Sequence, residues 1–216
     1  MISVCSRQEK LRQRASRSAL FAVIAVALAG CGSAHSLTAY NTGATAEAGR
    51  SKDIAALGRI LSTEPRDAAA FNIRGTAFGD AGELEKALAD FSAAIEANPS
   101  YHQAWSNRGL AYLRLGQLEP AKADFSHALS LAPDYPQALL GRGNVHRLSK
   151  RYNEARADYD RAIELDSSNP RAFYNRGLIF QAQGTHAKAL IDFAAAIRLD
   201  SLAGEPYYAR AISHIA

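Results

Sequence analysis

Cysteine is scarce in this sequence of 216 residues, which contains only Cys5 and Cys31. Two cysteines are too few for the disulfide framework that stabilises many small secreted domains. The six histidines show no metal-ligand spacing and have no partnering cysteines. The composition therefore predicts neither a disulfide scaffold nor a metal site.

An excess of charge of one sign is also missing once residues 1–30 are set aside. The whole chain carries a formal charge of +4, but five of its 25 basic residues and one of its 21 acidic residues lie in this first stretch. The rest of the chain contains equal numbers of both kinds. Nucleic-acid binding requires a concentrated basic surface, so the charge balance predicts no nucleic-acid partner.

Convergent catalytic groups are absent from the sequence as well. Asp124, Ser126 and His127 are close together, but neighbours one or two positions apart on a helix do not face each other, so they do not form a catalytic triad. The glycines follow a packing period and contain no phosphate-binding GxxxxGK[ST] motif. We therefore expect no enzyme activity.

No apolar run is long enough to span a membrane comfortably, since the longest, at 19–28, falls short of the roughly 20 residues that a spanning helix needs. The run follows a basic stretch at 7–17 and precedes small residues. This order is typical of a secretory signal peptide, here over 1–30. An uncleaved membrane anchor is the alternative. Cleavage after residue 30 would separate Cys5 from Cys31, so we expect no disulfide between them.

What the sequence does contain is a repeat with a period of 34 residues. A fixed period of this length predicts a solenoid of helix–turn–helix units, because one such unit cannot bury its apolar face alone. The period is kept by a glycine series (Gly75, Gly109, Gly143, Gly177), an alanine series (Ala87, Ala121, Ala155, Ala189) and a ring series (Phe91, Phe125, Tyr159, Phe193).

The second repeat carries the most complete motif. It contains Trp105, Arg108, Gly109, Tyr112, Gly116, Ala121, Phe125, Ala128 and Pro133. This pattern resembles the tetratricopeptide repeat (TPR) family, whose motif runs W-x2-L-G-x2-Y and then A, F, A and P. The resemblance implies an all-α fold, a right-handed α-solenoid of four TPR helix–turn–helix repeats with a half-repeat at each end.

The resemblance divides the chain into tandem units. Each full repeat should have a helix A over about its first fourteen residues, followed by a turn and a helix B. Asp67, Ser100 and Asn169 are placed to cap A helices. Glycines stand in the turns between helix A and helix B, except in repeat three, which has Lys150 there. The predicted units are an N-terminal half-repeat at 51–67, TPR 1 at 68–101, TPR 2 at 102–135, TPR 3 at 136–169, TPR 4 at 170–203 and a C-terminal capping helix at 204–216.

The series also predict how the helices pack. Each glycine of helix A should face the alanine of helix B in its repeat, as Gly109 and Ala121 do, so that the two backbones approach closely. His146 stands where other repeats have a ring, which predicts a packed core residue. Arginines precede the glycines and aspartates precede the rings, so we expect a ladder of ion pairs between neighbouring repeats. A basic strip for an acidic ligand is the alternative. The ladder would consist of Arg74, Arg108, Arg142 and Arg176 with Asp90, Asp124, Asp158 and Asp192.

The sequence LAGC at 28–31 resembles the lipobox of bacterial lipoproteins. The resemblance implies cleavage before Cys31 and a covalent lipid on its sulfur, since several acyl chains hold a protein on a membrane durably. Gly32, in place of an aspartate, favours the outer membrane, with the protein facing the periplasm. Residues 31–50 would then comprise the lipidated cysteine and a flexible tether of small residues.

In TPR proteins helix A lines a concave groove, and the resemblance therefore implies a peptide-binding groove in this chain. Leucines flanked by amides and arginines suit an extended peptide or a partner helix. Asn107 and Asn175 match one position of the carboxylate clamp of chaperone-binding TPR domains. Gln137 and Gly141 stand where that clamp needs lysine and arginine, so the clamp function is not predicted. A solvated face that binds nothing is the alternative. The predicted groove residues are Asn72, Gln103, Ser106, Leu110, Arg114, Gln137, Leu140, Asn144, Arg147, Arg171, Tyr174 and Leu178.

Together these features resemble the TPR lipoproteins of Gram-negative envelopes, including the NlpI type. The resemblance implies a lipid-anchored scaffold that binds a protein or peptide partner, with no catalysis and no cofactor other than the lipid on Cys31. The alternative is a passive structural or self-assembling envelope lipoprotein. A homo-oligomer is a further alternative, in which the B-type half-repeat at 51–67 of one copy and the A-type half-repeat at 204–216 of another combine head to tail.

Overall fold

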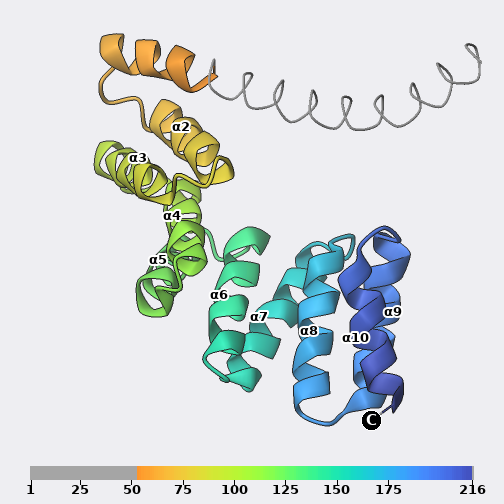
Figure 1. Cartoon of the computed structure of the whole chain (residues 1–216). Helices are drawn as coiled ribbons and strands as arrows, with labels where there is room; N and C mark the ends of the chain where they lie inside the picture. Colours follow the sequence, from red (N-terminus) through yellow and green to blue (C-terminus); the bar gives the residue numbers. More distant parts are fainter. Residues whose placement is uncertain (1–52, 216) are drawn as a thin grey trace, which may run out of the picture. The chain divides into compact units, whose positions relative to one another are not determined.

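The computed structural model describes residues 53–215, which form helices joined by short turns (Figure 1). The predicted signal peptide at 1–30, the lipidation site Cys31 and the tether lie outside the described residues. The predicted all-α fold is confirmed. A helix over 53–63 is followed by α2 (Ala68–Asp80), α3 (Leu84–Ala97), α4 (His102–Arg114), α5 (Leu118–Leu131), α6 (Pro136–Leu148), α7 (Tyr152–Leu165), α8 (Pro170–Ala182), α9 (His186–Leu199) and α10 (Gly204–Ile215).

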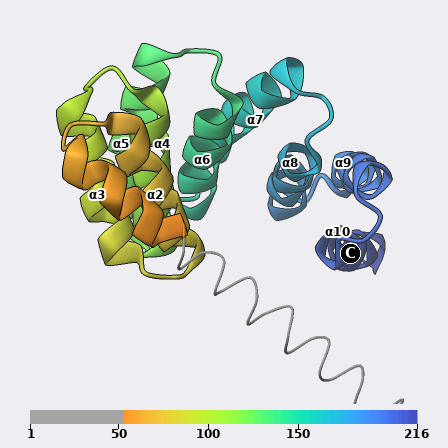
Figure 2. The same cartoon turned by 90° about the horizontal axis from the view of Figure 1, so that it is seen from above.

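The helices alternate between two roles. α2, α4, α6, α8 and α10 each begin 34 residues after the one before and take the position of helix A, whereas α3, α5, α7 and α9 take the position of helix B. Consecutive helices pack side by side, as Figure 2 shows for α8, α9 and α10. Among α2–α10, each A helix also contacts the neighbouring A helices, but no B helix contacts another B helix. The A helices therefore form one face of the array.

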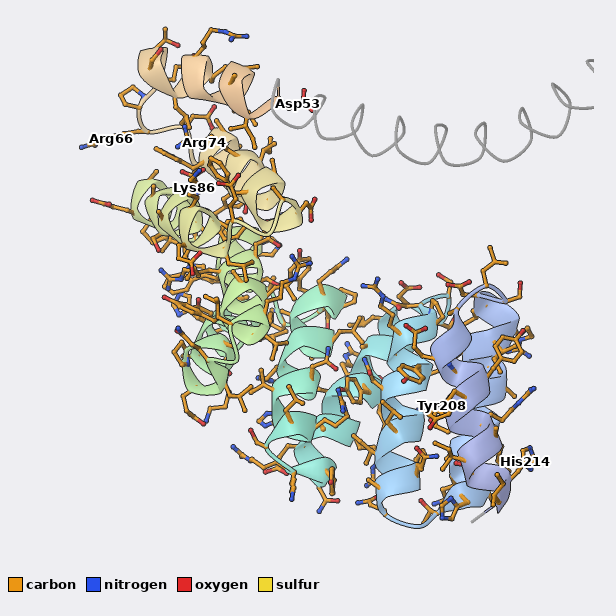
Figure 3. All side chains as sticks on the ribbon, viewed as in Figure 1. Asp53, Arg66, Arg74, Lys86, Tyr208 and His214 are labelled. Carbon is orange, nitrogen blue, oxygen red and sulfur yellow. The ribbon has the colours of Figure 1, made fainter. Side chains whose placement is uncertain are left out.

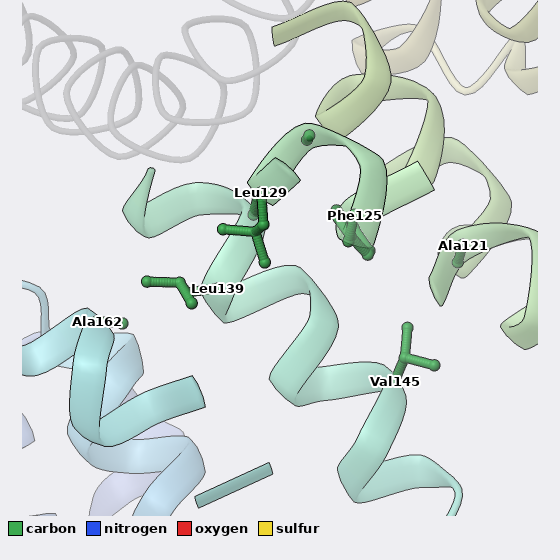
Figure 4. Packing of buried hydrophobic residues seen from close by; sticks show 8 residues of the cluster. Ala121, Phe125, Leu129, Leu139, Val145 and Ala162 are labelled. Carbon is green, nitrogen blue, oxygen red and sulfur yellow. The ribbon is translucent and has the colours of Figure 1, made fainter. Parts of the chain in front are cut away.

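The core between α5 and α6 shows how successive repeats pack (Figure 4). Phe125 of α5 is 1% exposed and belongs to one cluster with Leu139 and Val145 of α6. Its ring lies between α4 and α6. A Cβ atom added to Gly109 would lie 3.1 Å from Cε1 of this ring, and one added to Gly141 would lie only 2.3 Å from it. Two glycines on two different helices therefore make room for one phenylalanine.

The predicted pairing of helix A glycines with helix B alanines is wrong. The glycines face the rings instead: a Cβ atom added to Gly143 would lie 2.6 Å from Cε1 of Tyr159, and one added to Gly177 would lie 2.7 Å from Cε1 of Phe193. The ring residue follows the alanine by one helical turn on the same face of helix B. Its side chain is long enough to reach the backbone of helix A, so the ring fills the space that the glycine leaves.

Two of the three predicted helix caps are confirmed. Asp67 accepts hydrogen bonds from two backbone amides in the first turn of α2, and Asn169 accepts one at the start of α8. The prediction for Ser100 is wrong, because Tyr101 occupies the position directly before α4. The hydroxyl of Ser100 instead donates to Oδ1 of Asn98 at 2.7 Å.

Lys150 has a left-handed backbone conformation, with φ of 59°, in the turn between α6 and α7. Glycine occupies the same place in the other full repeats. Because a side chain is strained in this region, we expect Lys150→Gly to raise the free energy of unfolding by about 1 kcal/mol. Chemical denaturation measures the change. Lys150→Ala keeps the Cβ atom and should bring no such gain, and an unchanged midpoint for Lys150→Gly would contradict the prediction.

The predicted arginine–aspartate pairs form, but they lie within repeats rather than between them. Each arginine donates two hydrogen bonds to the aspartate sixteen residues later, on helix B of its own repeat. In repeat two, Nε and Nη2 of Arg108 lie 2.8 and 2.9 Å from the carboxylate oxygens of Asp124. Of these four arginines, only Arg176 also forms an ion pair with an aspartate of the preceding repeat: its Nη1 lies 2.8 Å from Oδ1 of Asp160. These charges are already paired, so they do not offer a basic strip to a ligand.

Candidate functional site

The inner face is the surface of the A helices that carries the predicted groove residues. Because neighbouring A helices contact one another, these side chains follow each other from α2 to α8. Their exposure differs from one to the next. Leu110, Arg114, Gln137 and Arg171 are exposed, and Gln103, Leu140, Asn144, Arg147, Tyr174 and Leu178 are partly buried.

The expectation that Asn72 and Ser106 are open to a ligand is wrong. They are 8% and 4% exposed, respectively. Oδ1 of Asn72 accepts a hydrogen bond from Nδ2 of Asn107 at 2.9 Å, so this pair ties α2 to α4. Ser106 is a short side chain on α4, a helix that contacts α2, α3, α5 and α6. Both residues therefore lie beneath the surface of the inner face and are not available for contact with a ligand.

Between α2 and α4 the inner face is nearly closed. Nη1 of Arg114 donates a hydrogen bond to the carbonyl oxygen of Gly79 at 3.0 Å, which holds the guanidinium against α2. The cavity beside it measures only about 40 Å³. Leu110, which also lines this cavity, is 42% exposed. This part of the face therefore offers a flat apolar contact next to a fixed positive charge.

Arg147 stands at the middle of the inner face, on α6. Its Nε is buried and has no hydrogen-bond acceptor among the described residues. Nearby, the hydroxyl of Tyr159 donates to Oδ1 of Asn144 at 2.7 Å. Burial raises the pKa of Tyr159, and the positive charge of Arg147 together with a hydrogen bond from its guanidinium partly offsets the rise. The buried tyrosine fixes the Asn144 amide, and Nε of Arg147 is the guanidinium nitrogen that has no acceptor among the described residues.

A pocket of about 330 Å³ lies at the C-terminal end of the inner face, between α8, α10 and the turn after α9. Two predicted groove residues, Arg171 and Tyr174, form part of it. Burial is the main cause of the raised pKa of Tyr174, and the carboxylate of Glu205 adds to it. The pocket is lined by Pro170, Arg171, Tyr174, Asn175, Asp200, Ala203, Glu205 and Pro206.

Six of these eight lining residues are not predicted as groove residues, and two of the six, Pro170 and Pro206, are prolines at the starts of α8 and α10. Sequence reasoning treats Asn175 only as a clamp position and assigns no role to Asp200, Ala203 and Glu205. Asp200 and Ala203 belong to the turn before α10 rather than to an A helix. A signal is nevertheless present, because Ala203 stands a whole number of periods after two tyrosines, Tyr101 and Tyr135.

His146, predicted as a core residue, is 8% exposed and lies in the core as expected. Its Nε2 is 3.9 Å from Oδ2 of Asp158 on α7. Burial lowers the pKa of His146. The carboxylates of Asp158 and Glu154 oppose this shift, and the charges of Arg151 and Arg142 reinforce it.

The lowered pKa of His146 predicts a loss of stability in mild acid. A histidine that is harder to protonate in the folded than in the unfolded state contributes no penalty above its ordinary pKa of about 6.5 and destabilises the fold as the pH drops below it. We expect His146→Phe to flatten this loss between pH 7 and 5, measured by thermal melts. A phenylalanine is compatible with this position, since the equivalent residues of repeats one and four are Phe78 and Phe180. His214→Gln on exposed α10 is the control and should keep the wild-type slope; equal slopes for all three proteins would contradict the assignment.

Two kinds of site do not occur in the part of the chain that the structure describes. Within residues 53–215, no three histidine, cysteine, aspartate or glutamate side chains gather closely enough to hold a metal ion. Over the same range, no helix combines the length and the apolar character required for a membrane span.

Comparison with known proteins identifies the repeat. Family models described as "TPR repeat" and "Tetratricopeptide repeat" match residues 75–116, 102–135, 143–184 and 170–201. None of the curated proteins matches the sequence.

Solved structures share the fold. TTC0263, a thermophilic TPR protein in Thermus thermophilus, gives a TM-score of 0.64 at 21% identity over 76% of this chain and 89% of its own. YrrB, a TPR protein with an unusual peptide-binding site, gives 0.61 at 23% identity over 74% and 82%. The first TPR domain of Spaghetti (RPAP3), bound to the HSP90 peptide SRMEEVD, gives 0.52 at 28% identity over 54% and 92%.

Proposed function

Since this chain belongs to the tetratricopeptide repeat family, we propose that it is a lipid-anchored scaffold of the bacterial envelope that binds an extended segment of a partner protein along its inner face. Two of the similar structures are described with a peptide-binding site or a bound peptide, which supports peptide binding as the mode. The proposed scaffold has no catalytic role.

The observation that carries the proposal is the unsatisfied donor of Arg147. Buried donors in folded proteins almost always have a partner, because an unpaired one is costly. In the proposed complex the partly exposed side chain of Arg147 turns toward the peptide, and its guanidinium donates to a carbonyl or carboxylate oxygen next to the amide of Asn144. Exposed leucines on either side, Leu110 and Leu148, at 42% and 50%, offer apolar contacts along the same face.

Site-specific photo-cross-linking in living cells tests peptide binding. A photoreactive amino acid is placed on the inner face at Leu110, Gln137 or Arg171, and on exposed positions of B helices, Ala123 or Arg156, as matched controls. We expect a discrete partner to be cross-linked from the inner face alone, and to be weakened by Arg147→Gln. Equal cross-linking from both faces would refute the assignment of the inner face.

The lipid anchor is tested separately through Cys31. Cys31→Ser should move the protein from the membrane fraction to the soluble fraction and abolish its labelling by a clickable fatty acid. Cys5→Ser is the control, because cleavage before residue 31 removes Cys5. A Cys31→Ser protein that stays in the membrane would refute the anchor and leave the inner-face proposal standing.

A second function, self-assembly, is favoured by the last helix. Tyr208 and Ile215 of α10 are 72% and 87% exposed, and Figure 3 shows Tyr208 and His214 on this helix. Exposed apolar side chains of this kind on one helix offer a surface to another copy of the chain. Light scattering tests this: Tyr208→Glu should lower the mass of any oligomer, and a concentration-independent monomer in the wild type would exclude it.

A further inference from the structure

The pocket between α8 and α10 exists because one side chain of the repeat is small. Ala203 is the last residue of repeat four, and the corresponding residues of repeats one and two are Tyr101 and Tyr135. Both tyrosines are partly buried and pack against the core. The pocket is therefore found where other repeats of the same chain place a ring.

The contacts of those two tyrosines locate the ring. The ring of Tyr135 lies edge-on to His102, the first residue of α4, with centroids 4.9 Å apart. The hydroxyl of Tyr101 accepts a hydrogen bond from Nδ2 of Asn72, the fifth residue of α2, at 3.5 Å. In α8 the first and fifth residues are Pro170 and Tyr174.

Pro170 and Tyr174 are both walls of the pocket. The surroundings that hold a tyrosine in repeats one and two are thus present in repeat four, but Ala203 leaves the volume of about 330 Å³ open. The last residue of repeat three, Asn169, serves instead as the cap of α8 and does not compete for this role.

We propose that this pocket receives a tyrosine side chain of the bound peptide, which takes the place that Tyr101 and Tyr135 hold in their own repeats. The inference rests on the proposed peptide-binding function and names the side chain that the inner face selects. Pro170, Pro206 and the ring of Tyr174 supply an apolar and aromatic surface for the incoming ring.

The charged residues that line the pocket determine which side chains it can bind. The carboxylates of Asp200 and Glu205 line it and accept the phenolic hydrogen, so tyrosine binds better than phenylalanine. Among the lining residues these two acids are accompanied by one cation, Arg171. An anionic side chain such as glutamate or phosphotyrosine is therefore repelled, and an aliphatic one lacks both the ring contacts and the hydrogen bond.

The experiment uses N-acetyl-tyrosinamide as the probe and the full-length protein labelled with ¹⁵N. We expect saturable shifts of the backbone amide signals of Tyr174, Asn175 and Ala203. N-acetyl-leucinamide and N-acetyl-O-phosphotyrosinamide should bind at least about tenfold more weakly, a difference of about 1.4 kcal/mol.

Ala203→Tyr is the decisive variant, because the protein itself carries tyrosine at this place in two repeats. It should fill the pocket, lose the tyrosinamide shifts and melt at or above the wild-type temperature. Ala203→Ser adds one small atom and is the matched control, which should keep the shifts. Unchanged tyrosinamide binding by Ala203→Tyr, or stronger binding of N-acetyl-argininamide than of N-acetyl-tyrosinamide, would overturn the inference.

The failure of this inference and that of the proposed function can be told apart. A partner cross-linked at Leu110 whose capture is unaffected by Ala203→Tyr would refute the tyrosine pocket and leave the inner face as the binding surface. Tyrosinamide binding that disappears in Ala203→Tyr, in a protein that cross-links equally from both faces, would uphold the pocket and refute the proposed function.

Discussion

Gly141→Ala should lower the free energy of unfolding by about 3 kcal/mol, the upper end of the usual range for overpacking a core. The new Cβ atom would lie 2.3 Å from Cε1 of Phe125, closer than any real carbon contact. The ring has little room to retreat, because α4 lies on its other side, where even a Cβ atom added to Gly109 would lie 3.1 Å from Cε1. Thermal and urea melts followed by circular dichroism measure the effect.

A matched glycine gives the control for Gly141→Ala. Gly204 at the start of α10 has no atom within 4 Å of an added Cβ, so Gly204→Ala should be neutral or slightly stabilising. Phe125→Leu removes the clashing ring edge, and the double variant with Gly141→Ala should be less destabilised than the sum of the two single changes. A Gly141→Ala protein that melts like the wild type would show that α5 and α6 are not packed as described.

Arg108→Ala should lower the free energy of unfolding by about 2 kcal/mol. Removing one partner of a buried ion pair commonly costs more than this, but the side chain of Arg108 is 18% exposed, and water compensates part of the loss. Asp124, with 6% of its side chain exposed, would remain buried without its two hydrogen bonds. The guanidinium also lies 4.9 Å from the ring centroid of Trp105, and this contact disappears too. Urea denaturation measures the loss.

Arg161→Ala is the control for that experiment. Arg161 also contacts two carboxylates, those of Asp134 and Glu164, but all three side chains are about half exposed or more. Such surface pairs contribute about 0–1 kcal/mol. The two arginines thus have similar partners and differ in burial, and equal destabilisation by both substitutions would contradict the role assigned to the buried pairs.

The register of the helices could be predicted from the sequence, but the partners of individual side chains could not. A 34-residue period identifies which residues are equivalent, and the A helices do begin at that interval. The period contains no information on how far a side chain reaches. It therefore predicts contacts between the glycines and Ala121 or its equivalents, although the ring one helical turn further along helix B fills the space beside each glycine. The same limit applies to the arginines, whose aspartates recur with the period whether they lie in the same repeat or in the next.

The candidate site was predictable where it follows the period and not where it departs from it. Leu110, Arg114, Gln137 and Arg171 are exposed on the A helices, as the resemblance implies. The pocket beside Tyr174 depends on a missing ring and on residues of a turn, and neither follows from the periodic pattern. Whether a periodic residue is buried, as Asn72 is, depends on contacts with adjacent helices that differ from repeat to repeat.

The chain contains a single tryptophan, Trp105, so its fluorescence reports on repeat two alone. Its indole Nε1 donates to the carbonyl oxygen of Pro99 at 2.9 Å, and its ring centroid lies 4.0 Å from that of His127, so its emission reports the environment of this one repeat. Circular dichroism averages over all the helices. In an array whose repeats touch only their neighbours, the ends can fray before the centre. If the ellipticity falls at lower urea than the fluorescence changes, the protein unfolds inward from its ends. Coincident curves mean that the four repeats act as a single cooperative unit.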